Sequence, residues 1–304
     1  MKILLTGATG FLGSHIAEVL VVKGNELLLT KRISSDLWRC DSFKNIVSWI
    51  NTDSSSWLVD VQHFNPDIII NSAWDGVSAA NRDEWSAQVK NIAFQQQLLE
   101  VSKLVNLKKF ISIGSQAEYG EFSGCIDENY PTNPTSAYGA TKLAASVILK
   151  TFCEQNIIKW YWFRLFSCFG ERESENWLIP ATIKNMLTHE SMDLTPGEQQ
   201  YSYLYVKDIA DLIASAIDSD AENGIYNIAS TQRRSLIEIL SMIKEYLNPS
   251  FKLNFGVLPY RTNQSMINGS FMEKTSRAFG NIDCNNFREK LFQTIEYYRR
   301  IFNE

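Results

Sequence analysis

Short apolar runs alternate with stretches of helical spacing through the first half of the chain, and this order constrains the fold more than any other feature. The runs typical of strands are Ile3 to Thr6, Leu27 to Thr30, Val47 to Ile50, Asp67 to Ser72, Lys109 to Ile113 and Trp160 to Phe166. Helical spacing extends over Ser14 to Val22, Val89 to Leu104 and Ala137 to Cys153. Strands that alternate with helices imply right-handed crossovers and a parallel, doubly wound α/β sheet. In such a sheet the ligand lies beyond the carboxyl ends of the strands.

The pattern changes after Gly170, where a polar, loop-like stretch begins. The elements expected beyond it are a helix over Ile209 to Ala216, a strand over Ile225 to Ala229 that returns to the main sheet, a helix opened by the capping-box pair Ser235 and Glu238, and a helix over Phe287 to Tyr298. We therefore expect residues 1–170, with 205–230 returning to them, to form a Rossmann domain that binds a dinucleotide. Residues 171–204 and 231–304 are expected to form a smaller, interleaved α/β lobe that binds the substrate.

Composition limits the range of partners. The chain has 304 residues, 45% of them hydrophobic and 21% charged, which is ordinary for a globular protein with a full core. A net charge of −5 without a basic tract argues against nucleic acid as a partner. Scattered cysteines without a C-x-x-C pair indicate reduced thiols, and three widely spaced histidines argue against a metal site. No apolar stretch has the length of a membrane span, so we expect a cytoplasmic protein that is not associated with a membrane.

Three glycines follow the first apolar run and open the first helix. Gly7 permits a tight turn, Gly10 lets the backbone approach a pyrophosphate, and Gly13 allows close packing of helix on strand. The start of the helix then offers unpaired N–H groups and a partial positive charge to an anion. The residues predicted to bind the cofactor here are Gly7, Thr9, Gly10, Phe11, Leu12 and Gly13.

The end of the second strand bears on which dinucleotide is bound. NAD sites usually carry an acidic residue there for the ribose 2′-hydroxyl, whereas this chain has Thr30, Lys31 and Arg32. A lysine or arginine would pair with a 2′-phosphate. NADP(H) is therefore favoured and NAD(H) remains possible, the alternative being that Lys31 and Arg32 are solvated surface charges. Asp53, after the third strand, is a candidate for contact with the adenine.

Tyr138 and Lys142 stand four residues apart in an expected helix, so their side chains share one face. The pKa of a free tyrosine is about 10, and a neighbouring ammonium favours the phenolate. The phenol could then exchange a proton with a hydroxyl or ketone while hydride moves to or from a nicotinamide. Ser115 ends the fifth strand and could bond the same substrate oxygen. The Tyr/Lys spacing is common in helices, but here a serine and the glycine turn converge on the same edge of the sheet.

With these motifs the chain resembles the extended short-chain dehydrogenase/reductase family, the NAD-dependent epimerase/dehydratase group that acts on nucleotide sugars. The resemblance covers nearly the whole chain. It rests on the glycine spacing, on Ser115 four residues before Tyr119, on the Tyr138 and Lys142 pair, and on the segment Arg164 to Gly170. It implies that Lys142 holds the nicotinamide ribose. It also implies cofactor contacts from Ala73, Asn91, Phe166 and Ser167.

The resemblance assigns further residues to a nucleotide-diphosphate sugar. Gln199 lies in the family's sugar-nucleotide segment, and Tyr201 stands where the family commonly has an arginine, which weakens one expected pyrophosphate contact. Arg261 matches a later pyrophosphate arginine, whose guanidinium suits two phosphate oxygens. Trp177 and Leu178 lie where the family touches the nucleotide or sugar, although a core role for Trp177 is an equal alternative.

Small replacements around one redox centre separate the reactions of this family. Gln116 and Ala117 follow the serine where dehydratases usually carry an acidic pair, so 4,6-dehydration is disfavoured. The prediction is an NADPH-dependent reductase of the C4 ketone of an NDP-4-keto-6-deoxy-hexose, in nucleotide-sugar biosynthesis for surface polysaccharide. In this reading Tyr138 donates the proton, Ser115 orients the carbonyl, and Lys142 lowers the tyrosine pKa.

Two other functions stay open. One is an NAD-dependent NDP-sugar 4-epimerase, and the other is a non-catalytic NADP-binding regulator, against which the intact Tyr/Lys pair argues. Members of the family usually pair through two long helices. The resemblance therefore implies a homodimer that pairs through Val89 to Leu104 and Ala137 to Cys153.

Overall fold

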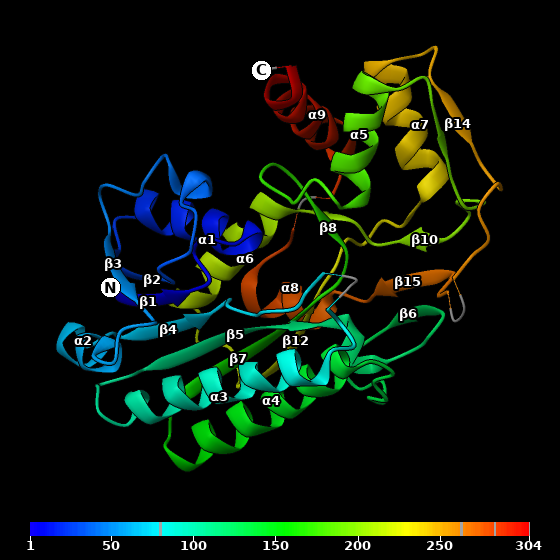
Figure 1. Ribbon diagram of the computed structural model, residues 1–304. Coiled ribbons are helices and arrows are strands. Elements are labelled where there is room, and N and C mark those ends of the chain that lie inside the picture. The colour runs from blue at the N-terminus through cyan, green and yellow to red at the C-terminus, as the bar shows by residue number, and fades with distance from the viewer. Residues whose placement is uncertain (79–80, 262–263, 283, 304) are drawn as a thin grey trace.

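The computed structural model describes residues 1–304 except 79, 80, 262, 263, 283 and 304. Its centre is a seven-stranded sheet in the order β12-β7-β5-β4-β1-β2-β3, in which every neighbouring pair is parallel (Figure 1). The strands are β1 (Lys2–Thr6), β2 (Glu26–Lys31), β3 (Ser48–Asn51), β4 (Ile68–Asn71), β5 (Lys109–Ser115), β7 (Lys159–Leu165) and β12 (Gly224–Ile228). The six apolar runs all lie in this sheet, and the predicted returning strand is β12. The α/β fold class is confirmed.

Side chains of the sheet alternate between two covered faces. In β1, Ile3 and Leu5 pack on the face that carries α1 and α6, whereas Leu4 packs on the face that carries α2, α3 and α4 (Figure 1). These helices are α1 (Phe11–Val22), α2 (Trp57–Phe64), α3 (Trp85–Ser102), α4 (Ala137–Gln155) and α6 (Val206–Asp218). Because both faces are buried, the strands are apolar at successive positions instead of alternating with polar residues.

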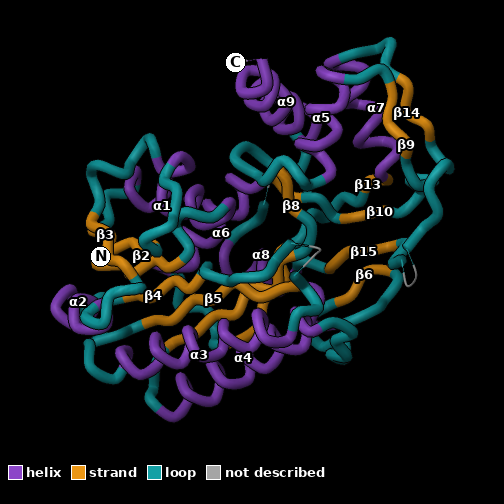
Figure 2. The backbone as a smooth tube through the Cα atoms, in the orientation of Figure 1, coloured by secondary structure: helices purple, strands orange, loops and turns teal. Residues whose placement is uncertain are grey.

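A second hydrophobic core lies among α5 (Leu178–Thr188), α7 (Leu236–Leu247) and α9 (Phe287–Asn303), which we call the second lobe. The predicted capping box is present at α7, where Ser235 accepts the N–H of Glu238. Figure 2 shows β10 and β13 between this lobe and the central sheet. The remaining elements are η1 (Trp38–Cys40), η2 (Gln116–Tyr119), β6 (Gly124–Ile126), β8 (Cys168–Phe169), β9 (Ser191–Asp193), β10 (Gln200–Tyr201), β11 (Leu204–Tyr205), β13 (Arg234–Ser235), β14 (Lys252–Asn254), β15 (Ile267–Ser270) and α8 (Glu273–Phe279).

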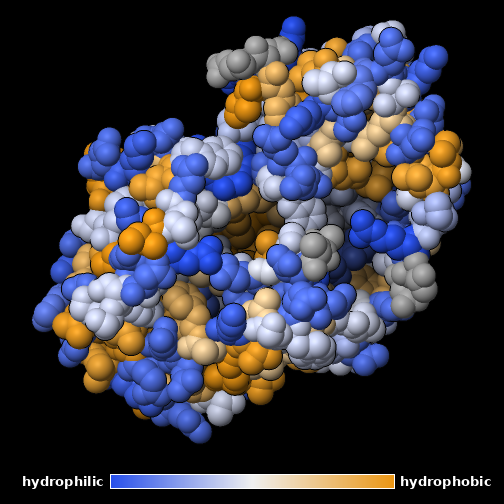
Figure 3. Space-filling view, viewed as in Figure 1, coloured by the Kyte–Doolittle hydropathy of each residue, from blue (hydrophilic) through white to orange (hydrophobic). Residues whose placement is uncertain are grey.

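The site is positioned by the parallel order of the sheet. All seven strands point the same way, so β1, β4, β5 and β7 end at one edge, and the second lobe faces that edge (Figure 1). The space-filling view shows the surface hollowed between the two parts (Figure 3). Within the described part of the chain, no helix is long and apolar enough to cross a membrane.

Candidate active site

A cavity of about 680 Å³ lies between the carboxyl edge of the sheet and the second lobe. The predicted site residues that line it are Gly7, Gly10, Phe11, Leu12, Gly13, Ser115, Tyr138, Lys142, Phe166, Ser167, Trp177, Leu178, Tyr201 and Arg261. The structure thus brings residues from the first turn of the chain and from its last third to the same cavity. This arrangement would let one ligand reach the glycine turn and a second ligand reach the second lobe.

The glycine turn is packed tightly against the backbone around it. Gly7 has a φ of +73°, and a Cβ added to it would lie 2.6 Å from the backbone nitrogen of Ala73. A Cβ on Gly13 would overlap the carbonyl oxygen of Gly7. The helix α1 begins at Phe11 with no acidic residue in its first turn, so its first N–H groups remain available to an anion. These features fit the pyrophosphate of a dinucleotide.

The charges at the end of β2 already have partners. Arg32 Nη1 lies 3.0 and 3.2 Å from the two carboxylate oxygens of Asp75, and both side chains are exposed. Lys31 Nζ lies 5.9 Å from the ring centroid of Trp49. The guanidinium of Arg32 is therefore balanced by a carboxylate at the sheet edge where a 2′-phosphate was predicted.

Eight predicted site residues do not line the cavity: Thr9, Thr30, Lys31, Arg32, Asp53, Ala73, Asn91 and Gln199. Asp53 accepts the N–H of Ile33 at 2.7 Å and thereby holds the turn after β2. Asn91 accepts the N–H of Asp75 at 2.8 Å and so holds the loop after β4. Asp53 and Asn91 thus each hold a loop at the carboxyl edge of the sheet. Both lie beside the cavity and not in its wall.

Tyr138 stands in the first turn of α4, whose N-cap Ser136 accepts the N–H of Gly139 at 3.1 Å. Only 7% of Tyr138 is exposed. Burial raises the pKa of its phenol, while the Arg82 guanidinium and a hydrogen bond with Ser115 act in the opposite direction. The phenol thus lies in a site where its ionisation depends on a few neighbouring groups.

Lys142 makes its hydrogen bond with a backbone carbonyl and not with the phenol. Its Nζ donates to the carbonyl oxygen of Ile113 at 2.6 Å and lies 3.7 Å from a ring centroid of Trp74, but 6.0 Å from that of Tyr138. Burial lowers the Lys142 pKa to about 7, and the charge of Glu118 opposes this shift. The sequence predicted that this ammonium would favour the phenolate, whereas the cation that acts on the phenol here is Arg82.

Arg82 was not anticipated from the sequence. Its guanidinium carbon lies 4.9 Å from the ring centroid of Tyr138 and 5.8 Å from that of Trp177. Its Nε donates to the carbonyl of Val77 at 3.0 Å, and its own carbonyl accepts the N–H of Tyr138 at 2.9 Å. The loop after β4 is therefore fixed to the start of α4. Arg82 belongs to no spaced motif, so the sequence carried no signal for it.

Glu118 is a second residue at the site that was not predicted from the sequence. It is fully buried and accepts the N–H of Ser115 at 2.8 Å, the Nε1–H of Trp162 at 2.8 Å and the Nε–H of Arg164 at 2.7 Å. In turn, Ser115 Oγ accepts the N–H of Ala117 at 3.2 Å. The Ser-x-x-Glu spacing of a capping box was the available signal. Glu118 fixes the backbone that carries Ser115.

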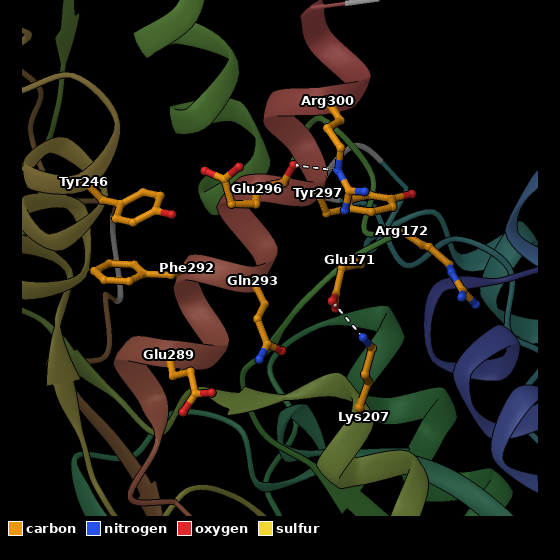
Figure 4. Close-up of a pocket in the computed structure, with 10 residues that line it drawn as sticks. All are labelled: Glu171, Arg172, Lys207, Tyr246, Glu289, Phe292, Gln293, Glu296, Tyr297 and Arg300. Carbon is orange, nitrogen blue, oxygen red and sulfur yellow. Dashed lines mark hydrogen bonds and ion pairs between the residues drawn. The ribbon is translucent and has the colours of Figure 1, made fainter.

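A second cavity, of about 520 Å³, lies between α9 and the start of α6 (Figure 4). In it, Lys207 Nζ lies 2.8 Å from Glu171 Oε1, and the rings of Tyr246 and Phe292 stack at 4.1 Å. Its lining mixes acidic and basic side chains and includes none of the predicted site residues. Over the described residues, no group of three or more His, Cys, Asp or Glu side chains is placed to hold a metal ion.

Comparisons with known proteins agree with this architecture. The model of the NAD dependent epimerase/dehydratase family matches residues 3–229. The chain is 26% identical over 280 residues to CDP-abequose synthase of Salmonella muenchen, covering 90% of this chain and 91% of that protein. It is 26% identical over 275 residues to dTDP-6-deoxy-L-talose 4-dehydrogenase (NAD(+)) of Aggregatibacter actinomycetemcomitans, covering 88% and 98% of the two chains.

Among solved structures, the fold matches UDP-glucuronic acid 4-epimerase of Bacillus cereus, in complex with UDP-glucuronic acid and NAD, with a TM-score of 0.87. The two chains are 24% identical, and the match covers 99% of this chain and 100% of the epimerase. The family model spans well over half of the chain, from β1 to the end of β12. The chain therefore belongs to the NAD-dependent epimerase/dehydratase family.

Proposed function

We propose that the protein is a nucleotide-sugar oxidoreductase that reduces the C4 ketone of an NDP-4-keto-6-deoxy-hexose with NADPH. The observation that carries the proposal is the placement of Ser115, Tyr138 and Lys142 on one cavity with the glycine turn. The similar proteins support the nucleotide-sugar part of the proposal, since their names refer to CDP-, dTDP- and UDP-linked sugars. The glutamine and alanine after Ser115 support reduction over dehydration.

The residues of the chain have defined tasks in this reaction. When bound, the dinucleotide supplies the hydride. Tyr138 donates its phenolic proton to the C4 oxygen as the ketone becomes a hydroxyl. Ser115 Oγ accepts the N–H of Ala117, and the hydrogen bond of its own proton can pass from the phenol to the same substrate oxygen. Both side chains are buried, each only 7% exposed, and burial strengthens both interactions.

The loops around the cavity hold the two ligands in this proposal. The N–H groups at the start of α1 bind the dinucleotide pyrophosphate. Residues 1–170 with 205–230 bind the dinucleotide, and residues 171–204 with 231–304 bind the nucleotide sugar through the residues that line the cavity, namely Trp177, Leu178, Tyr201 and Arg261. Arg32 binds the 2′-phosphate of NADP(H) after exchanging its partner Asp75 for the phosphate.

We also propose a homodimer that pairs through α3 and α4. Large apolar side chains are exposed on both helices: Trp85 at 60%, Val89 at 54%, Val147 at 56% and Ile148 at 39%. Pairing would remove these side chains from water. Sedimentation of the purified protein checks the assembly, and a monomer at micromolar concentration would contradict it.

The test is a screen of purified protein for NADPH oxidation with freshly made CDP-, dTDP-, GDP- and UDP-4-keto-6-deoxy sugars. We expect consumption of NADPH with one of these substrates. The Tyr138→Phe variant should lose about 10²–10⁴-fold in kcat while its NADPH affinity stays unchanged. The exposed Tyr130→Phe change is the matched control. Protein that neither binds NADPH nor oxidises it with any of the four would refute the proposal.

An NAD-linked 4-epimerase of an NDP sugar is the second candidate. The ion pair between Arg32 and Asp75 favours it, because it neutralises the positive charge that would attract a 2′-phosphate. The solved epimerase with NAD agrees with this alternative. NAD that stays bound through purification, with interconversion of two sugars and no net change in the dinucleotide, would establish the epimerase.

A further inference from the structure

Glu173 carries a buried carboxyl on the wall of the active-site cavity. It lies in the loop between β8 and α5, and only 8% of it is exposed. Its backbone carbonyl accepts the hydroxyl of Tyr298 at 2.9 Å, which fixes this part of the loop. Its carboxyl, in contrast, has no hydrogen bond or ion pair with any residue that the structure describes.

The other carboxylates that are equally buried in the described chain all have partners. Glu118 accepts three N–H groups, as described above. Glu171, also 8% exposed, accepts from the hydroxyl of Tyr205 at 2.8 Å and from Lys207 Nζ at 2.8 Å. Buried polar groups in native proteins are nearly always paired, and an exception calls for an explanation. A missing partner on a cavity wall points to a partner on the ligand.

The surroundings define which form of the carboxyl the ligand meets. Burial raises the pKa of Glu173 to about 8, and no cation among the described residues opposes this shift. Burial raises the pKa of Cys168 and of Tyr203, which line the same cavity, and Glu173 in its ionised form raises both further. Cys168 also raises the pKa of the Tyr138 phenol, so Glu173 and the catalytic phenol share a neighbour. At neutral pH the group is mainly an uncharged acid with one donor and one acceptor.

We propose that Glu173 binds a hydroxyl group of the substrate's sugar ring and thereby selects among sugars. An uncharged carboxyl can donate its proton to a hydroxyl oxygen and accept the hydroxyl's proton in return. A site built to bond a hydroxyl rejects an analogue without it, because the protein group is then left buried and unpaired. The inference rests on the proposed function in one respect, that the ligand is a nucleotide sugar.

Binding to the sugar is tested by calorimetry on NADPH-saturated protein. The probes are UDP, CDP, GDP and dTDP, each alone and as its glucose conjugate. For the conjugate that the wild type binds, Glu173→Leu should weaken binding about tenfold and leave the Kd of the bare nucleotide and of NADPH unchanged. Glu173→Gln should keep most of the affinity, because an amide also donates and accepts. Glu175→Gln, an exposed carboxylate paired with Lys184, is the matched control.

Stability of the ligand-free protein provides a readout that needs no substrate. Leucine has no polar group to leave unpaired, and the cavity beside residue 173 has room for its side chain, so Glu173→Leu should raise the Tm. A lower Tm for both the Leu and the Gln variant would show a structural role and overturn the proposal. A loss of NADPH affinity with unchanged binding of the glucose conjugate would overturn it too, in favour of a cofactor contact. If the wild type binds none of the eight probes, the proposed function fails, and the sugar contact fails with it.

Discussion

At the scale of single residues, the ionisation of one phenol is set by opposed effects. Burial disfavours the charged phenolate of Tyr138, while Arg82 and Ser115 favour it. Five groups from different elements interact with the ring. They are the Arg82 guanidinium from the loop after β4, the Ser115 hydroxyl from the end of β5, the Glu118 carboxylate from η2, the Cys168 thiol from β8 and the Lys142 amine from α4. The largest favourable charge comes from a residue outside the Tyr/Lys motif.

Replacing Arg82 by glutamine should therefore raise the pKa of the Tyr138 phenol, because the guanidinium 4.9 Å from the ring is lost. Arg82→Lys should restore most of the effect. Ultraviolet difference titration of phenolate absorbance, with Tyr138→Phe as the blank, measures the shift. When the enzyme oxidises a sugar hydroxyl, the phenolate accepts the proton. The acid limb of the pH profile of kcat should therefore move to higher pH in Arg82→Gln. Identical titrations of Arg82→Gln and wild type would show that Arg82 only positions the loop.

Glu173 should make stability depend on pH. Its pKa is about 8 in the folded protein against a usual value of 4.5, so between these values the folded protein holds a proton that the unfolded chain has released. Stability should therefore fall as pH rises through this window, and Glu173→Gln should remove that slope. In the described part of the chain, the titratable groups that interact with Glu173 are Cys168, Tyr203 and Tyr298, none of which is a cation. Denaturant unfolding of both proteins across the window measures the difference, and equal slopes would contradict this origin.

At the scale of elements, the junction between β5, η2 and α4 is held by a buried ion pair. Arg164 Nε and Glu118 Oε2 lie 2.7 Å apart, with side chains 2% and 0% exposed. The same carboxylate accepts the N–H of Ser115, so the position of Ser115 depends on the ion pair.

Glu118→Gln should lower the free energy of unfolding by about 3–5 kcal/mol, because the Arg164 charge is left buried and unpaired. Denaturant unfolding gives this value. Glu245→Gln breaks the exposed pair with Arg288, 65% and 56% exposed, and should change stability by less than about 1 kcal/mol. A similar small change in both variants would show that the buried pair does not hold the junction.

At the scale of the whole molecule, the cavity joins two separate hydrophobic cores. One side belongs to the sheet with α1 and α6, and the other to α5, α7 and α9. A ligand that binds between them stabilises the folded state of both.

Saturation with a dinucleotide at a hundred times its Kd should add about 2.7 kcal/mol of stability, seen as a higher Tm. Gly13→Ala should abolish this increase, because its Cβ would overlap the carbonyl oxygen of Gly7 and displace the turn. Gly24→Ala, at a turn with nothing within 4 Å of the added Cβ, is the control for general effects of glycine replacement. An unchanged ligand shift in Gly13→Ala would exclude the turn as the binding site.

The amino-acid sequence by itself determined the parallel sheet, the glycine turn and the Tyr138 and Lys142 pair. These features follow from local rules, namely the spacing of apolar side chains and the sterics of glycine, that hold wherever the segment lies. It did not predict α2, α5 or the short strands, whose segments are too short or too irregular to show a period. The direction of Lys142 toward Ile113 and the approach of Arg82 and Glu173 to the cavity were decided only by tertiary structure. Arg82 and Glu173 reach the site from loops, and the path of a loop depends on the packing of the whole molecule around it. Lys142 lies on α4, and the direction of its long side chain depends on which acceptor the packing brings near it.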